Sequence, residues 1–149
     1  MENKKNEAIS ADIISLFDEI ITKGTITGDV TLGDNLKITL KVLDTGELLA
    51  AEADATTNHP FFPADIVSRG RVVSILTSAT VYLNGIEIEQ PSLSKEENNA
   101  RKKVLFKKYM ALPVHQIDKA YDRYKELQEE QKKLFSKPME EIKENIENF

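Results

Sequence analysis

The sequence predicts an α+β fold, in which antiparallel β-hairpins pack against helices and a long amphipathic helix lies toward the C-terminus. Hydrophobic residues recur every three to four positions near both ends of the chain, but every two positions between residues 24 and 44. Asn84-Gly85 separates two short alternating runs and predicts a second hairpin over residues 81–89, because both residues of such a turn need positive φ. These changes of period indicate a single α+β domain over residues 1–135 and a separate C-terminal tail at 136–149.

Composition limits the possible function. The chain has 149 residues, enough for one domain with a real core, and a formal net charge of −5, which argues against nonspecific binding to nucleic acid. It has no cysteine, which excludes disulfides, a thiolate nucleophile and a cysteine-built zinc site. No apolar run approaches the ~20 residues that span a bilayer, and the first residues do not resemble a signal peptide. We therefore expect a cytoplasmic protein that binds neither nucleic acid nor membrane.

The first half begins with a helix over residues 9–22. Its apolar stripe comprises Ile9, Ile13, Leu16, Phe17 and Ile20, widened by Ile14 and Ile21. The hairpin at 24–44 alternates apolar residues with threonine, lysine and aspartate, which predicts one face in water. Gly28 interrupts its first strand and suggests a bulge or a bend.

Residues 45–79 predict two helices. Thr45 is the expected cap of a short first helix that ends near Ala55. Pro63 is expected in the first turn of a second helix that runs to about Ser78. The β-branched run RVVSILTSATVYL is also compatible with a strand, although we favour the helix.

Residues 94–135 predict two further helices. Ser94 and Glu97 form a capping box before a helix that ends near Met110 and carries Ala100, Val104, Leu105 and Lys108. Leu112-Pro113 then starts the long helix, which runs to Phe135. Its apolar face is predicted to comprise Ile117, Ala120, Tyr121, Tyr124, Leu127, Gln128, Gln131, Leu134 and Phe135.

The tail at 136–149 is the first candidate for binding a partner. Burial of its apolar stripe would stabilise it by roughly 6–12 kcal/mol, which does not clearly exceed the entropic cost of ordering about a dozen residues. We predict that the tail is mobile alone and becomes a helix when it docks on a partner; the alternative is that it folds back on its own domain. The candidate partner-binding residues are Met139, Ile142, Ile146 and Phe149 in the tail, with Tyr121 and Tyr124 on the long helix.

No pattern in the sequence predicts catalysis, a cofactor or a metal site. His59 and His115 stand alone, without the spacing of metal ligands, and no Gly-x-Ser-x-Gly elbow is present. Arg69 and Arg71 flank Gly70 in an apolar stretch, where ion pairing or snorkelling is favoured over binding of an acidic partner.

The order of these elements resembles a known family. GTITGDVTL leads into LKITLKVLDTGELLAAEA, an apolar helix precedes VYLNGIEIE, and a charged helix closes on ALPVHQIDKAYDRYKELQEEQKKL. Together they resemble the small tail-assembly chaperones and baseplate hub proteins of tailed bacteriophages, over roughly residues 24–135. Asp44-Thr45-Gly46-Glu47 stands where that family has a threonine pair.

The resemblance implies a non-enzymatic protein that binds other tail or baseplate proteins, either transiently as a chaperone or permanently in the baseplate. It implies a location in the host cytoplasm during assembly or in the virion tail, and a homo-oligomer is compatible with it. Two alternatives stay open from the residues alone. One is a small cytoplasmic adaptor or regulatory domain, and the other is an acidic enzyme.

Overall fold

The structure, a computed structural model, describes residues 11, 13–22, 25–58 and 64–147, and their side chains except at 55–58, 64–68 and 135–147. The chain divides into two compact units. One is Thr27–Glu129, and the other combines residues 1–26 with residues 130–149. The sequence predicted one domain over 1–135, whereas the structure assigns the N-terminal helix to the second unit.

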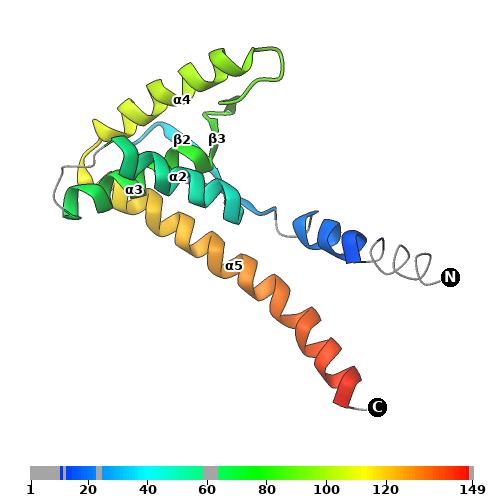
Figure 1. The fold of residues 1–149 in the computed structure, drawn as a ribbon. Coiled ribbons are helices and arrows are strands. Elements are labelled where there is room, and N and C mark those ends of the chain that lie inside the picture. Colours follow the sequence, from blue (N-terminus) through cyan, green and yellow to red (C-terminus); the bar gives the residue numbers. More distant parts are fainter. Residues whose placement is uncertain (1–10, 12, 23–24, 59–63, 148–149) are drawn as a thin grey trace. The chain divides into compact units, whose positions relative to one another are not determined.

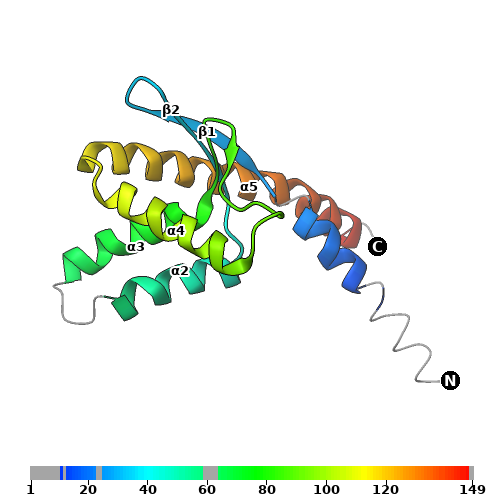
Figure 2. The ribbon, with the colours of Figure 1, turned by 90° about the horizontal axis from the view of Figure 1, so that it is seen from above.

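The α+β class is confirmed. The elements in chain order are β1 (Thr27–Leu32), β2 (Leu36–Lys41), α2 (Thr45–Asn58), α3 (Ala64–Ala79), β3 (Thr80–Leu83), β4 (Ile86–Glu87), α4 (Lys95–Met110) and α5 (Val114–Glu147) (Figure 1). A further helix covers residues 13–22. Within unit Thr27–Glu129, α2 packs against α3 and α3 packs against α4 (Figure 2).

The four strands form one antiparallel sheet in the order β1-β2-β3-β4. The two predicted hairpins are therefore present, and pairing of β2 with β3 joins them. Alternate residues of β1 and β2 are buried on one face of the sheet, namely Val30, Leu32, Ile38 and Leu40. The other face is polar, as the alternation predicted.

Asp29 organises the polar face of this sheet. Its carboxylate accepts a hydrogen bond from the Thr39 hydroxyl at 2.6 Å and pairs with the Lys37 ammonium at 3.3 Å. The hydrogen bond from Thr39 is the main cause that lowers the pKa of Asp29, and Lys37 adds to it. Side-chain pairs across the strands thus hold the register on the side that faces water.

The turn of the second hairpin is the predicted one. Asn84 and Gly85 have φ values of 48° and 81°, in the left-handed region. Asn84 also ties the turn to β2, because its backbone N–H donates to the Lys37 carbonyl at 2.8 Å and its side-chain oxygen accepts from the Lys37 N–H at 2.7 Å. The turn therefore fixes the position of β3 beside β2 as well as the hairpin itself.

Gly28 serves a different purpose from the one predicted. It pairs regularly with Leu40, and the irregularity of the sheet lies between Thr39 and Leu40, where β2 pairs with β3. A Cβ atom on Gly28 would lie 2.6 Å from the Leu127 Cδ2 and 2.6 Å from the Arg123 Nη2. The glycine therefore allows α5 to approach β1 closely. The prediction of a bulge or bend at Gly28 is wrong, because the strand pairing is regular there.

The helix caps follow short-range chemistry. Asp44, not Thr45, caps α2: its carboxylate accepts from the Glu47 N–H at 2.8 Å, and the Glu47 carboxylate accepts from the Asp44 N–H at 3.2 Å. The helix runs three residues past the expected end at Ala55. The predicted Ser94 cap of α4 is confirmed, with the Ser94 hydroxyl accepting from the Glu97 N–H at 3.1 Å.

The ambiguous run RVVSILTSATVYL contains both predicted conformations. Its first part completes α3, which ends at Ala79, and β3 starts at the next residue. The Thr80 hydroxyl at this junction donates to the Leu76 carbonyl at 2.6 Å. The β-branched residues thus suit a buried helix end and a strand in succession.

Helix α5 buries one of its faces in unit Thr27–Glu129. Ala120, Tyr124 and Leu127, all predicted for this face, are at most 1% exposed. The Pro113 carbonyl accepts from the N–H groups of Gln116 and Ile117, so the proline lies at the entrance of the helix, as predicted. The helical backbone continues past the expected boundary at 135, to Glu147.

The helix at residues 13–22 confirms the central part of the predicted N-terminal helix. Its large apolar side chains are 47–65% exposed and comprise Ile13, Ile14, Leu16, Phe17, Ile20 and Ile21. The predicted first residue of this stripe, Ile9, lies outside the described residues.

Candidate functional site: an apolar groove along α4

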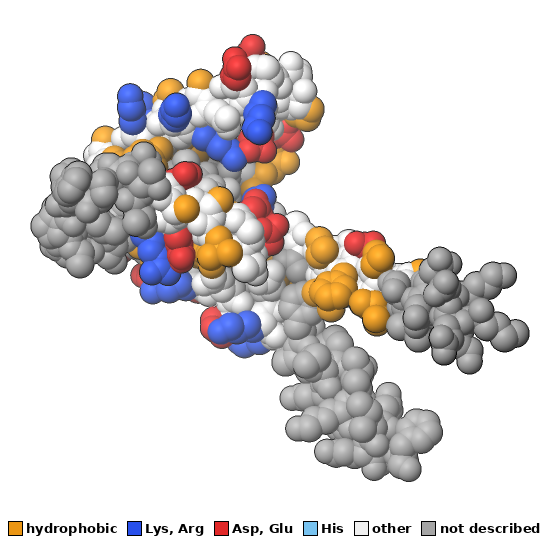
Figure 3. Space-filling view, viewed as in Figure 1, with side chains coloured by type: hydrophobic (Ala, Val, Ile, Leu, Met, Phe, Trp, Pro, Cys, Tyr) orange, Lys and Arg blue, Asp and Glu red, His pale blue; other side chains and the backbone are white. Residues whose placement is uncertain are grey.

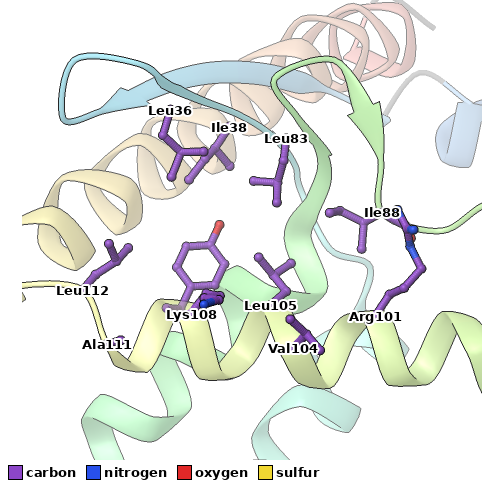
Figure 4. A pocket seen from close by; sticks show the side chains of 11 residues that line it. Leu36, Ile38, Leu83, Ile88, Arg101, Val104, Leu105, Lys108, Ala111 and Leu112 are labelled. Carbon is purple, nitrogen blue, oxygen red and sulfur yellow. The ribbon is translucent and has the colours of Figure 1, made fainter.

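In unit Thr27–Glu129, a cavity of about 620 Å³ lies between α4 and the sheet (Figure 4). We call it the α4 groove and define it by its apolar residues Leu36, Ile38, Leu83, Ile88, Val104, Leu105 and Leu112. Leu36 and Ile38 come from β2, Leu83 from β3, and Val104 and Leu105 from α4. The volume lies within the range of ligand sites, and the lining is almost wholly apolar.

Helix α4 presents one helical face to the groove. Arg101, Val104, Leu105, Lys108 and Tyr109 are spaced at intervals of three and four, so this face spans about 12 Å of helix. Leu105 and Tyr109 are buried, whereas Val104 remains 58% exposed. The sequence predicted an apolar set that included Ala100 and Val104; the structure corrects it, because Ala100 is exposed and Tyr109 takes the buried position instead.

Tyr109 anchors the C-terminal end of α4 to the junction of α3 and β3. Its hydroxyl lies 2.6 Å from the Thr80 hydroxyl. Thr80 already donates its single proton to the Leu76 carbonyl, so Tyr109 is the donor in this pair. Burial raises the pKa of Tyr109 to about 12, which keeps the donor protonated. The sequence did not single out Tyr109, since its burial depends on contacts with α3.

Arg101 holds the opposite end of the groove. Its guanidinium donates to the Ile88 carbonyl at 2.9 Å and to the Glu87 carbonyl at 2.8 Å. The adjacent Lys102 pairs with Glu89, and a hydrogen bond from Lys102 lowers the pKa of that carboxyl. These contacts fix the segment after β4 to the N-terminal half of α4, and thereby place the Ile88 side chain in the groove (Figure 4).

The rim of the groove is positively charged. Six cations lie along α4, namely Lys95, Arg101, Lys102, Lys103, Lys107 and Lys108, and Lys and Arg side chains mark this helix in Figure 3. Lys108 lines the groove and is exposed. Its ammonium makes no hydrogen bond or ion pair with the part of the chain that the structure describes. An anionic group that docks along the groove therefore has a free cation within reach.

A second cavity, of about 300 Å³, lies on the other side of Tyr109 and Leu112. Its lining includes Val72 from α3 and Ile117 from α5, together with Arg69, the residue considered above for an acidic partner. Arg71 is instead paired with Glu52 at 2.7 Å, as the favoured interpretation predicted. Tyr109 and Leu112 thus line both cavities.

The predicted partner-binding residues do not converge on this groove. Tyr124 is 1% exposed, and its hydroxyl accepts from the Leu43 N–H at 3.4 Å. It is therefore a core residue, and the expectation that it contacts a partner is corrected. Tyr121 remains partly exposed, stacks on Tyr124 with ring centroids 6.1 Å apart, and lies beneath the Lys125 ammonium.

The remaining predicted residues fall outside what the structure describes. The backbone at Met139, Ile142 and Ile146 is helical, but their side chains are not among the described ones, and Phe149 lies beyond the described residues. His59 is also outside them, whereas His115 is exposed in the first turn of α5.

The described residues contain no group of three or more histidine or acidic side chains arranged to hold a metal ion. Within the same residues, every buried side-chain nitrogen or oxygen has a hydrogen-bond partner. None of the helices, over the part of the chain described, is long and apolar enough to cross a bilayer.

The chain was also compared with known proteins. No protein-family model matches it, and no match was found among curated proteins or among solved structures.

Proposed function

We propose that this chain is a non-enzymatic protein that binds other proteins through the α4 groove. In keeping with the resemblance in its sequence, the proposed setting is the tail of a tailed bacteriophage, where the chain acts as a baseplate hub component or as a tail-assembly chaperone. Its partners are then other tail or baseplate proteins.

The observation that supports binding is the half-open apolar surface along α4. A small domain rarely leaves a wide apolar surface uncovered unless that surface docks on something. Here the groove of about 620 Å³ carries Val104 at 58% exposure in its lining, while the polar contacts of Arg101 and Tyr109 hold its two ends in place. A preformed groove of this kind loses little entropy when a partner binds.

The test is affinity capture of the tagged chain from infected cells, followed by mass spectrometry and by electron microscopy of purified virions. We expect named tail or baseplate proteins to be captured by the wild-type chain and lost with Val104→Asp, which places a charge in the groove. Leu49→Asp is the matched control, because Leu49 is 61% exposed on α2 and lies outside the groove.

Capture of tail proteins that is equally strong with both variants would contradict the role of the groove. Capture of host regulatory proteins instead, with no copy of the chain in virions or in assembly intermediates, would contradict the tail setting and favour the adaptor interpretation.

A further inference from the structure

We infer that the α4 groove binds an amphipathic α-helix of a partner protein whose flanks are acidic. This inference rests on the proposed function and deepens it, because it states the conformation and the charge of the segment that docks. It follows from three properties of the groove: the geometry of its lining, the shortage of polar partners in that lining and the charge of its rim.

The first property is the geometry of the lining. The face that α4 offers runs from Arg101 to Tyr109, about 12 Å, and the sheet offers Leu36, Ile38 and Leu83 opposite it. Two apolar walls, one helical and one of strands, leave a hollow between them (Figure 4). A segment that fills it must present apolar side chains at intervals of three and four along roughly two turns, which is the pattern of a helix docked in a groove.

The second property is the shortage of polar partners for a backbone. Of the polar groups in the lining, Arg101 directs two of its N–H donors to the Glu87 and Ile88 carbonyls, and Tyr109 donates to Thr80. An extended peptide would bring its own unpaired N–H and C=O groups into a lining that is nearly free of polar atoms, at a cost of several kcal/mol. A helix satisfies these groups internally, so the lining favours a helix over a strand.

The third property is the charge of the rim. Lys108 is exposed on the groove without a partner among the described residues. Within α4 the acidic residues are confined to the first turn, at Glu96 and Glu97. Glutamate or aspartate on the flank of a docked helix would meet Lys108, whereas lysine would be repelled by it.

The test uses two synthetic, fluorescently labelled peptides of about 15 residues with the same leucine stripe and alanine elsewhere, except on the flanks of the stripe, which carry glutamate in one peptide and lysine in the other. Fluorescence anisotropy with the full chain measures binding. We expect the glutamate helix to bind saturably, at least about tenfold more tightly than the lysine helix, and to weaken as salt is raised.

Matched variants locate the contact. Lys108→Glu should weaken binding of the glutamate helix by about tenfold, and Lys103→Glu by much less, because Lys103 carries the same charge on the same helix but does not line the groove. Val104→Asp should abolish binding, while Leu49→Asp should leave it unchanged. Circular dichroism of each variant verifies that it remains folded.

Three results would overturn the inference. The first is the absence of saturable binding by the glutamate helix, and the second is an equal loss with Lys103→Glu and Lys108→Glu. The third is tight binding of dodecanoate, which Val104→Asp abolishes, with no binding of either helix; this would assign the groove to a small amphiphile. Binding of the glutamate helix with no tail protein captured from infected cells would keep the inference and contradict only the tail setting.

Discussion

Helices α4 and α5 both face the apolar side of the sheet, yet one closes on it and the other leaves a groove. On α5, Ala120, Tyr124 and Leu127 are at most 1% exposed, and Gly28 lets the helix approach β1 closely. On α4, Leu105 and Tyr109 are buried, but Val104 is 58% exposed and lines a cavity of about 620 Å³. Similar apolar spacing thus produces a packed core on one helix and an open groove on the other.

The difference arises from what lies opposite each helix. α5 meets a strand that carries glycine at the point of contact, so no side chain holds the two apart. The polar contacts of Arg101, in the middle of α4, and of Tyr109, near its C-terminus, hold this helix at the two ends of the groove, opposite Leu36, Ile38 and Leu83. The groove is therefore a consequence of where the anchors lie.

The largest expected difference between α4 and α5 is in the free energy of unfolding that is lost when an apolar side chain is shortened to alanine. Leu127→Ala should lower the free energy of unfolding by about 2–5 kcal/mol, since it opens a cavity in a fully buried site. Val104→Ala should cost less than about 1 kcal/mol, because the side chain is already more than half in water. Urea unfolding of both variants measures the contrast, and equal losses would show that α4 is packed like α5.

The close approach of α5 can be tested from the opposite strand. Gly28→Ala should cost about 1–3 kcal/mol, because the new methyl group would lie 2.6 Å from the Leu127 Cδ2 and the backbone or α5 must shift. Gly46→Ala is the control, since a Cβ atom there meets only the Asp44 carboxylate at 3.5 Å. Thermal unfolding of the two variants should differ clearly. A neutral Gly28→Ala would mean that α5 has room to move away.

The sheet side of the groove depends on the Asn84-Gly85 turn. Gly85→Val should destabilise the protein by about 1 kcal/mol or more, because a β-branched residue does not accept φ near 81° without strain. The same change should weaken binding in the groove, since the turn positions Leu83 beside Ile38. An unchanged melting temperature would contradict the role assigned to this turn.

The anchor at Tyr109 predicts a pH dependence. The pKa of Tyr109 rises from 10.0 to about 12 in the folded protein, so between these values the folded state holds a proton that the unfolded chain has lost. Its contribution to stability is full below about pH 10 and is lost as the pH rises through about 12. Tyr109→Phe should cost about 1 kcal/mol at neutral pH and make unfolding less sensitive to alkaline pH.

Denaturant unfolding at pH 8 and at pH 11 measures this effect. Tyr121→Phe is the control, because Tyr121 remains partly exposed. An equal pH dependence in the wild-type chain and in Tyr109→Phe would show that folding does not change the pKa of Tyr109.

The sequence was sufficient for the features that depend on local chemistry. The Asn84-Gly85 turn, the Ser94 cap and the apolar face of α5 at Ala120, Tyr124 and Leu127 follow from short-range patterns, and the structure confirms them. The cap of α2 was misplaced by one residue, because Asp44 and Thr45 are both good caps and only the position of Glu47 decides between them.

The groove could not be predicted in this way. Its lining combines β2, β3, the segment after β4 and α4, which are far apart in the chain, and periodicity does not reveal whether two apolar faces touch. Gly28 is a second example. The side chains that leave no room for a Cβ atom at this position belong to α5, about a hundred residues further along the chain. For Tyr124 the pattern identified the correct face, but it did not distinguish a core residue from a partner-binding one.

The most direct test of the contrast between α4 and α5 is to measure stability and binding together in Val104→Asp. The expected result is a free energy of unfolding within about 0.5 kcal/mol of the wild-type value, together with complete loss of binding of the glutamate helix. A loss of more than about 2 kcal/mol would contradict the account, because it would place Val104 in a packed core like that of α5. Unchanged stability with unchanged binding would contradict it as well, because the groove would then not be where the partner docks.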